Sequence, residues 1–244
     1  TNPANKLSWT FLILLSPIFG LMVYFLFGRS GLTKHTRERM DAVNRQVEAL
    51  FQRDSAVEKG LEKESRSAYL QSSYIDKWAG FPLYQNTQTK YYSCGEEMFP
   101  DMLEALRGAK HFIFLEYFII EEGYMFNTIL DILEEKAKAG VDVRFIYDDV
   151  GSINSISFGY YKKLQERGIP CVTFNPFKPL ISVVMNNRDH RKIFVVDGYI
   201  GFTGGINLAD EYINKVKRFG YWKDTGVRIE GEAVWSLTAM FLEM

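Results

Sequence analysis

The 244-residue sequence is poor in cysteine and carries almost no net charge. Its two cysteines, Cys94 and Cys171, fit a reducing compartment, and neither lies in a Cys-x-x-Cys or Cys/His pattern that would bind a metal ion. The formal charge of -1 gives no basic footprint of the kind that nucleic-acid-binding proteins carry. We therefore expect no nucleic-acid partner.

Acidic clusters suited to a metal ion are also scarce. Asp148-Asp149 and Glu121-Glu122 are candidates, because carboxylates are the protein ligands that magnesium prefers. No second carboxylate group is placed to complete either site, so the sequence predicts no metal centre. Glu116 is more unusual because it lies within an apolar strand-like run. It faces either a buried partner or a pocket, and the sequence does not decide between them.

Charge is absent from one long run near the start of the chain. Leu7 to Phe27 are 21 residues without a charged side chain, and at about 1.5 Å per residue a helix of that length matches a bilayer core. The run is too long for a signal-peptide core, and no small-residue cleavage site follows it. Pro17 and Gly20 could kink the helix, but both residue types are tolerated in membranes. The sequence predicts a transmembrane segment within residues 1–28.

Positive charge lies mainly on the C-terminal side of this run. Lys6 alone precedes it, whereas five basic residues follow it closely. They are Arg29, Lys34, Arg37, Arg39 and Arg45. Because cytoplasmic flanks carry the excess of Lys and Arg, we expect a cell-membrane protein whose catalytic domain is cytoplasmic. The chain starts at Thr1 rather than Met, so the number of membrane spans in the full protein stays open.

Residues 29–82 are charged, rich in helix formers and poor in Pro and Gly. Their few apolar residues, Val43, Val47, Leu50 and Phe51, recur at helical spacing, which predicts a juxtamembrane helical linker. The basic start of this linker could contact anionic lipid headgroups. A solvated spacer is an equally good interpretation.

Residues 83–244 alternate between helix-like and strand-like segments. In order, we expect a helix at Glu96–Ala109, a strand at His111–Ile120, a helix at Tyr124–Ala139, a strand at Val141–Asp149, a helix at Phe158–Arg167 and a strand at Ile169–Phe174. Helices, glycines and strands repeated at this spacing are typical of β-α-β units. The sequence therefore predicts an α/β fold with a mixed, mostly parallel sheet flanked by helices.

Further elements follow a proline-containing loop at Asn175–Leu180. We expect a buried strand at Ile193–Val196, a hairpin turn at Asp197-Gly198, a returning strand at 199–204, an amphipathic helix from Leu208, a strand at Thr225–Glu230 and a last helix after Gly231. This last helix runs into Met244 without a capping residue. We therefore expect a catalytic domain that is truncated at its C-terminus.

One constellation suits phosphate chemistry. His190 and Lys192 are two residues apart, so in a strand their side chains would share one face. An ammonium group can hold phosphate oxygens while an imidazole attacks phosphorus. Gly204-Gly205, followed by Asn207, would let backbone N–H groups and an amide approach the same anion. On these features alone a non-functional interpretation stays open, since His-x-Lys is common and Asp-Gly needs no function in a hairpin.

His190, Lys192 and Asp197 match the pattern H-x-K-x-x-x-x-D, and Gly-Gly-x-Asn follows at Gly204–Asn207. With this pattern the sequence resembles the phospholipase D superfamily. From about Tyr91 onward it is similar to bacterial cardiolipin synthases in the segments YYSCGEEMF, IFLEYFII, KAKAGVDVRFIYDDVGS and YWKDTGVRIEGEAV. The superfamily more often has serine where Gly205 stands, and glycine there is typical of the synthase branch.

The resemblance implies a phospholipase D-like fold and a catalytic group of His190, Lys192 and Asp197. His190 would attack the phosphodiester to give a phosphohistidine, while Lys192 would bind phosphoryl oxygens. At the hairpin turn, Asp197 is expected to support its loop rather than to touch phosphate. Gly204, Gly205 and Asn207 would help to bind substrate.

Three further charged residues have open roles. Asp224 either orients His190 through its second ring nitrogen or is a surface residue at the start of a strand. Arg188 and Arg191 either hold an anionic headgroup or are solvated.

The resemblance further implies a phosphatidyltransferase that joins two phosphatidylglycerol molecules into cardiolipin and releases glycerol, without a cofactor. The family places two such motifs around one site, whereas here neither His35 nor His111 has a lysine two residues on. The second motif would come from a missing C-terminal half or from a homodimer partner. The alternatives are a phospholipase D-type hydrolase and, if the chain is complete, an inactive lipid-binding half.

Overall fold

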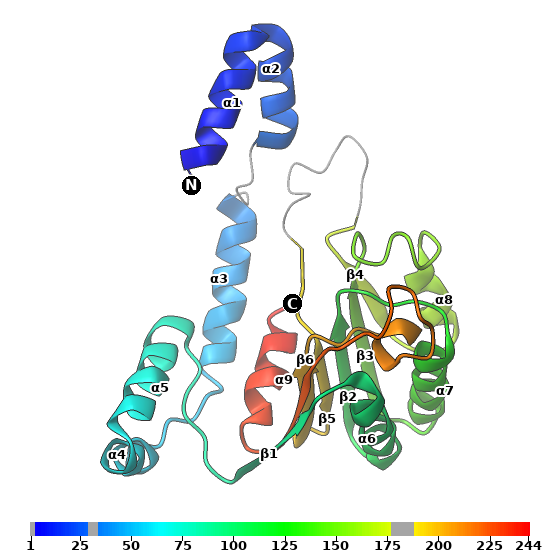
Figure 1. The fold of residues 1–244 in the computed structure, drawn as a ribbon. Coiled ribbons are helices and arrows are strands. Elements are labelled where there is room, and N and C mark those ends of the chain that lie inside the picture. Colours follow the sequence, from blue (N-terminus) through cyan, green and yellow to red (C-terminus); the bar gives the residue numbers. More distant parts are fainter. Residues whose placement is uncertain (1–2, 29–33, 177–187) are drawn as a thin grey trace.

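The computed structural model describes residues 3–28, 34–176 and 188–244. Within them one sheet of seven strands forms the centre of the molecule, in the order β1-β7-β6-β5-β2-β3-β4 (Figure 1). The strands are β1 (Thr87–Tyr92), β2 (Phe112–Tyr117), β3 (Asp142–Asp148), β4 (Cys171–Phe174), β5 (Ile193–Val196), β6 (Ile200–Gly204) and β7 (Gly226–Gly231).

The sheet is mixed, but the prediction that it is mostly parallel is wrong. Only β2, β3 and β4 pair in parallel, whereas β2–β5, β5–β6, β6–β7 and β1–β7 pair antiparallel. Parallel neighbours need a long crossover, and helices α7 (Tyr124–Lys138) and α8 (Tyr160–Glu166) supply it for β2, β3 and β4. Strands β5 and β6 are joined by a tight turn at Asp197-Gly198, which forces them to pair antiparallel.

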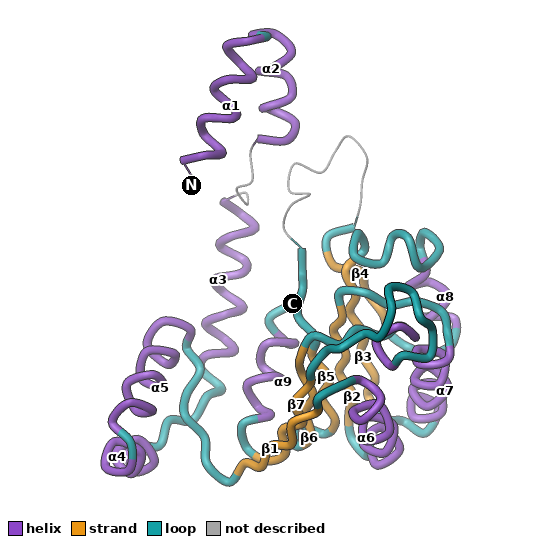
Figure 2. Tube along the Cα trace, in the orientation of Figure 1, coloured by secondary structure: helices purple, strands orange, loops and turns teal. Residues whose placement is uncertain are grey.

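Helices cover both faces of the sheet, as Figure 2 shows. Helices α6 (Gly95–Gly108), α7 and α8 pack on one face, in a core that includes Ile113, Leu115 and Tyr117 of β2. Helix α9 (Val234–Leu242) packs on the other face against Phe114. The alternating residues of β2 therefore point to opposite layers, and Glu116 falls on the same face as Phe114.

The predicted elements of this domain agree closely with the structure, with two exceptions. The edge strand β1 was not expected, and the amphipathic helix predicted from Leu208 is wrong. In its place is a single 3-10 turn at Asp210–Ile213. The backbone of Leu208 is hydrogen-bonded to the segment after β2. Its N–H donates to Ile119 O, and its carbonyl accepts from Glu121 N. The Asp210 carboxylate accepts hydrogen bonds from the first N–H groups of α7, so this segment serves as a cap rather than a helix.

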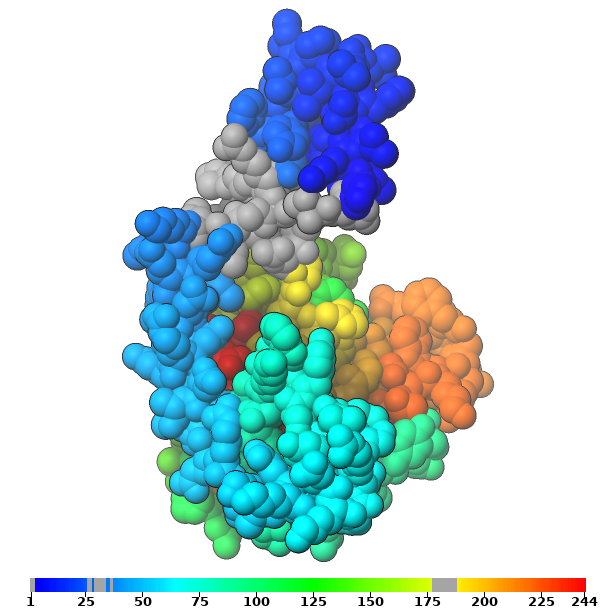
Figure 3. Space-filling model, turned by 90° about the vertical axis from the view of Figure 1, so that its left-hand side faces the viewer, coloured from blue at the N-terminus to red at the C-terminus, as the bar shows by residue number. Residues whose placement is uncertain are grey.

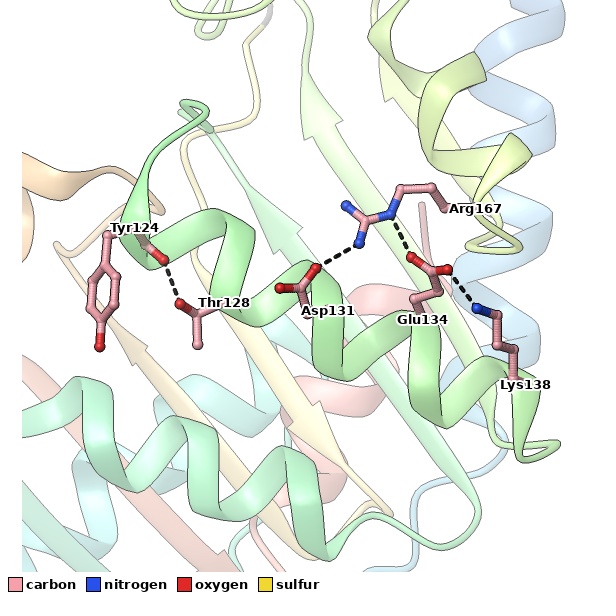
Figure 4. A network of polar contacts seen from close by, with 6 residues as sticks. All are labelled: Tyr124, Thr128, Asp131, Glu134, Lys138 and Arg167. Carbon is pink, nitrogen blue, oxygen red and sulfur yellow. Dashed lines mark hydrogen bonds and ion pairs between the residues drawn. The ribbon is translucent and has the colours of Figure 1, made fainter.

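The surface of α7 carries an ion-pair network that joins it to the end of α8 (Figure 4). The Arg167 guanidinium donates to Asp131 at 2.8 Å and to Glu134 at 2.7 Å, and Lys138 also donates to Glu134. Asp131 is 75% exposed. Such surface pairs contribute only about 0–1 kcal/mol.

The N-terminal apolar run differs from the single helix that the sequence predicts. It forms α1 (Pro3–Leu15), α2 (Pro17–Val23) and a short π-helix at Tyr24–Gly28. Ser16 leaves the helical region with φ -143°, because the following proline lacks an N–H and restricts the residue before it. The two helices pack side by side (Figure 1). In the described ranges no helix is both long and apolar enough to cross a membrane.

The linker is helical, as predicted, and comprises α3 (Lys34–Glu48), α4 (Ser55–Glu64) and α5 (Arg66–Ala79). Val47 and Phe51 are buried in a cluster with Ala239 of α9, whereas Leu50 is exposed. In Figure 3 this segment, blue to cyan, lies across the side of the molecule where α9, in red, is visible. The linker therefore docks on the domain, and its contact with lipid headgroups stays a prediction.

Two of the sequence predictions concern residues outside the described ranges. They are the flanking charge of Arg29 and the part of the proline-containing loop beyond Pro176.

Candidate active site

His190 and Lys192 lie next to each other at the N-terminal end of the central strand β5, in the segment that leads into it rather than in the strand itself. Lys192 Nζ is 3.2 Å from Nδ1 of His190, and it also donates to the His190 carbonyl oxygen at 2.8 Å. Phe118, directly after β2, packs against both side chains, with ring centroids 4.7 Å from His190 and 5.4 Å from Lys192 Nζ. The structure therefore brings together the imidazole and the ammonium group, as the spacing predicts.

The two side chains differ in their exposure. Lys192 is buried, with 4% of its surface exposed, whereas His190 is exposed. Burial lowers the pKa of Lys192, and the carboxylates of Asp189 and Asp224 act in the opposite direction. The lysine is thus held in a fixed position beside a histidine that a substrate can reach.

Asp197 lies at the opposite end of β5 from this pair. Its carboxylate accepts three hydrogen bonds, from the backbone N–H groups of Lys110, His111 and Phe112, at 2.8, 2.7 and 2.9 Å. Burial alone would raise the pKa of Asp197, but these three donors outweigh it and lower the pKa. Asp197 therefore fastens the β5–β6 turn to the start of β2, and the geometry gives it no contact with His190.

The glycine pair brings β6 and β7 close together. A Cβ atom at Gly204 would come within 2.3 Å of Thr225 O, and one at Gly205 within 2.0 Å of Asp224 Oδ1. The N–H of Gly205 donates to Thr225 O at 3.0 Å, so it does not point to an incoming anion as predicted. Glycine at 205 instead makes room for the Asp224 carboxylate.

Asn207 is buried and is hydrogen-bonded at both the oxygen and the nitrogen of its side chain. Its Oδ1 accepts from Ile119 N at 3.0 Å, and its Nδ2 donates to the Tyr212 hydroxyl at 2.9 Å. An amide nitrogen carries two hydrogens, so one donor is left for a substrate. The main contribution of Asn207 here is to join the chain after β6 to the chain after β2.

Asp224 acts on Lys192 rather than on His190. Its Oδ1 accepts from Thr225 N at 2.8 Å, and Oδ2 lies 3.5 Å from Trp222 Nε1. Among the described residues no hydrogen bond joins Asp224 to His190, so the predicted orienting contact is absent from this structure. The negative charge of Asp224 nevertheless favours the charged form of Lys192.

Several side chains that the sequence left open form the support of this segment. The Arg188 guanidinium contacts Asp148 at 3.3 Å and donates to Asn175 O at 3.1 Å, and Arg191 Nε donates to Glu116 Oε1 at 2.6 Å. Both arginines therefore bind carboxylates of the protein. Glu116 is fully buried, which decides its role in favour of a buried partner.

Asp148 is an anchor at the end of β3. It accepts from the N–H groups of Gly151 at 2.8 Å and Asp189 at 3.0 Å. In the part of the chain that the structure describes, no group of three or more His, Cys, Asp or Glu side chains is placed to hold a metal ion. Asp189 gave no signal in the sequence, because nothing in the pattern marks the residue before the histidine.

The fold and the His-Lys pair define a phospholipase D-like domain. A family model described as "Cardiolipin synthase, PLD-like domain" matches residues 102–227, and one described as "Phospholipase_D-nuclease N-terminal" matches residues 1–29. The chain belongs to the cardiolipin synthase family of phospholipase D-like proteins.

Named relatives agree with this assignment. Cardiolipin synthase 1 of Bacillus anthracis is 36% identical over 99% of this chain and 48% of its own length. An uncharacterized protein of Streptococcus mutans is 42% identical over 98% of this chain and 52% of its own length. The chain thus spans about half the length of the curated relatives it matches.

Solved structures give weaker matches. Nuc, a phospholipase D family member from Salmonella typhimurium, aligns with 65% of this chain and 91% of its own, at 20% identity and a TM-score of 0.46. The phosphatidylserine synthase of Haemophilus influenzae aligns with 61% of this chain and 34% of its own, at 18% identity and a TM-score of 0.48.

Proposed function

We propose that this chain contributes one half of the active site of a membrane-anchored phosphatidyltransferase that makes cardiolipin from two phosphatidylglycerol molecules. The observation that carries the proposal is the buried ammonium of Lys192, held 3.2 Å from Nδ1 of an exposed histidine. The relatives named cardiolipin synthase support the choice of cardiolipin as the product.

In the first step a ring nitrogen of His190 attacks phosphorus of phosphatidylglycerol. A phosphorus–nitrogen bond forms while the bond to the glycerol oxygen breaks, and the leaving oxygen takes a proton from a second motif histidine. In the second step that histidine removes a proton from a hydroxyl of another phosphatidylglycerol. The resulting oxygen attacks phosphorus, the bond to His190 breaks, and cardiolipin leaves.

Lys192 acts on charge rather than on protons in this scheme. Its ammonium lies where it can contact the phosphoryl oxygens, whose charge it stabilises in the transition state. The carboxylates of Asp189 and Asp224 favour its charged form, against the effect of its burial. No metal ion is needed for these steps.

The proposal requires a second His-x-Lys pair. The described residues hold one such pair, at His190 and Lys192. The second pair would come from another copy of this chain or from further residues of a longer protein.

Hydrolysis of a phosphodiester is the second candidate function. The exposure of His190 favours it, because water can reach a phosphohistidine at an exposed position. Transfer and hydrolysis share the first step and differ only in which hydroxyl attacks in the second.

The test uses the full protein, produced in membranes that contain labelled phosphatidylglycerol. We expect cardiolipin and glycerol from the wild type and an acid-labile labelled phosphohistidine after rapid quenching. His190→Ala should abolish both the product and the labelled protein, whereas His35→Ala, at an exposed position of α3, should change neither. Phosphatidic acid as the product would favour hydrolysis. Full activity of His190→Ala would refute both functions.

A further inference from the structure

Two buried carboxyl groups, Glu116 and Asp189, contact the segment that carries the His-Lys pair, and their ion pair with Arg191 leaves one oxygen of each unexplained. Glu116 of β2 is 0% exposed, and Asp189, the residue before His190, is 6% exposed. One oxygen of each, Glu116 Oε2 and Asp189 Oδ2, is buried without a hydrogen-bond partner. A buried carboxylate oxygen left in this way costs free energy, so two of them in one place need an explanation.

One cation serves both groups. Arg191 Nε is 2.6 Å from Glu116 Oε1 and 3.4 Å from Asp189 Oδ1, and the backbone N–H of Arg191 donates to the same Asp189 oxygen at 3.1 Å. The partnered oxygens therefore face the arginine, whereas the unpartnered oxygens do not. Two ionised carboxylates beside one guanidinium would repel each other in the interior, and each would leave one buried oxygen without a donor.

Both carboxyl groups flank the same Arg191 nitrogen, at 2.6 and 3.4 Å, and Asp189 raises the pKa of Glu116 as a neighbouring acid does. Burial, opposed by Arg191 and aided by Asp189, raises the pKa of Glu116 to about 8. A carboxylic acid can donate where a carboxylate can only accept. A single proton between the two groups would thus satisfy both unpartnered oxygens and leave one negative charge for Arg191.

We propose that Glu116 and Asp189 share one proton between their unpartnered oxygens, and that this bond, together with Arg191, fixes the segment that presents His190 and Lys192. The pair are positioning residues, since neither touches the reacting atoms. The positioning role rests on the proposed function, whereas the shared proton does not.

The other charged groups around Glu116 and Asp189 each interact with an oppositely charged group. On the β3 side, Asp148 contacts Arg188 and accepts the Asp189 N–H. The ammonium of Lys192 interacts with Asp189, and at the end of α9 Glu243 interacts with Arg191. Burial raises the pKa of Glu243, so variants of that residue are needed beside those of the pair.

The segment that carries the histidine is held at every residue. Asp189 N is tied to Asp148, Arg191 is tied to Glu116, and Lys192 Nζ donates to the His190 carbonyl. Loss of the shared proton would place two like charges side by side below this segment. We therefore expect the position of His190 to depend on the protonation of the pair.

The first test counts the protons that the chain releases when it unfolds. An unfolded glutamate is ionised at pH 6.5, so a proton held in the folded pair is released on unfolding. We expect Glu116→Gln to release about one proton fewer than the wild type at that pH, because its amide donates to Asp189 without titrating. Glu104→Gln on α6, at an exposed position, should release as many as the wild type.

Asp189→Asn separates a shared proton from simple burial of Glu116. In this variant the asparagine amide donates to Glu116, which then stays ionised in the folded state. Unfolding of Asp189→Asn should therefore also release about one proton fewer than unfolding of the wild type. The double variant Glu116→Gln/Asp189→Asn should lose no more than either single variant. Glu243→Gln should leave the effect of Glu116→Gln unchanged. An unaltered count in Glu116→Gln, or a full count in Asp189→Asn, would overturn the shared proton.

The second test follows His190 directly. The chain has three histidines, so the ring resonances of His190 can be assigned by variants of the other two. In the wild type we expect these resonances to shift or broaden as the pH rises through about 8, and in Glu116→Gln to stay unchanged over that range. Identical titrations in both proteins would overturn the positioning role, whether or not the chain makes cardiolipin.

Activity supplies the last comparison. If the protein makes cardiolipin, Glu116→Gln should retain activity and keep it to higher pH than the wild type, whereas Glu116→Leu should lose it. Activity lost equally in both variants, with both folded, would contradict the positioning role. Absence of activity in the wild type would count against the proposed function and leave the proton count as the deciding measurement.

Discussion

Replacement of Asp197 by asparagine tests whether this residue of the motif stabilises the fold. Asparagine tolerates the left-handed backbone that position 197 adopts, with φ 53°. The change therefore alters the carboxylate and little else. It replaces one acceptor oxygen by an NH2 group, which then faces backbone N–H donors from the segment entering β2.

The expected cost follows from the hydrogen bonds. Each bond to a charged group contributes about 1.5–3 kcal/mol, and asparagine retains one acceptor. We therefore expect Asp197→Asn to lower the free energy of unfolding by about 2–4 kcal/mol near pH 7. The matched control is Asp131→Asn in the surface network of Figure 4, where we expect less than about 1 kcal/mol.

The pH dependence gives the prediction a direction. Because the folded pKa of Asp197 is lowered, its stabilisation is present above the ordinary aspartate pKa and is lost as the pH falls through the folded value. The difference between wild type and variant should thus shrink in acid. Urea unfolding followed by circular dichroism measures the difference in free energy of unfolding between the two proteins, once at pH 7 and once in acid. A difference below about 0.5 kcal/mol at pH 7, or one that does not shrink in acid, would refute the reasoning.

Two other substitutions test the scaffold around the pair. Gly205→Ser would place a Cβ atom 2.0 Å from Asp224 Oδ1, so we expect it to lower the melting temperature. The double variant Gly205→Ser/Asp224→Gly should partly restore the melting temperature. Equal melting temperatures for the wild type and Gly205→Ser would contradict this reasoning. Asn207→Leu would leave Ile119 N and the Tyr212 hydroxyl without partners, at an expected cost of about 2–4 kcal/mol in urea unfolding. A cost below about 1 kcal/mol would mean that water replaces the amide.

The domain was predictable wherever local pattern decides structure. The strand Ile193–Val196 and the turn after it were predicted to the residue, since a short apolar run followed by Asp-Gly permits few alternatives. The pairing direction was not predictable in the same way. Helix-and-strand alternation before β5 suggested a mostly parallel sheet, but direction depends on which strands become neighbours, and β5 lies beside β2 rather than β4.

The misjudged helices have physical causes of the same kind. The amphipathic pattern after Leu208 predicts a helix, but the backbone of Leu208 is hydrogen-bonded to the segment after β2 and a helix does not form from it. In the apolar run, hydropathy favoured one long helix, whereas Pro17 and the contact of Gly20 with Leu12 favour two short ones. At the site, the spacing of His190 and Lys192 predicted that their side chains lie together, whereas their proposed role came from the longer motif and the family resemblance. The anion contact expected of the Gly205 N–H is absent, because this donor is bonded to Thr225 O and spacing does not reveal which donors are already used, whereas the substrate contact of Asn207 stays a prediction.

The anchors at the two ends of β5 give the spacing of the H-x-K-x-x-x-x-D pattern a structural meaning. Four residues of strand separate Lys192 from Asp197. At the start of this strand Ile193 pairs with Glu116 of β2, and just after its end Asp197 accepts a hydrogen bond from Phe112 of β2. The interval between Lys192 and Asp197 therefore fixes the register of β5 against β2. A residue inserted into it would leave both ends chemically intact and yet turn Lys192 to the opposite face of the sheet.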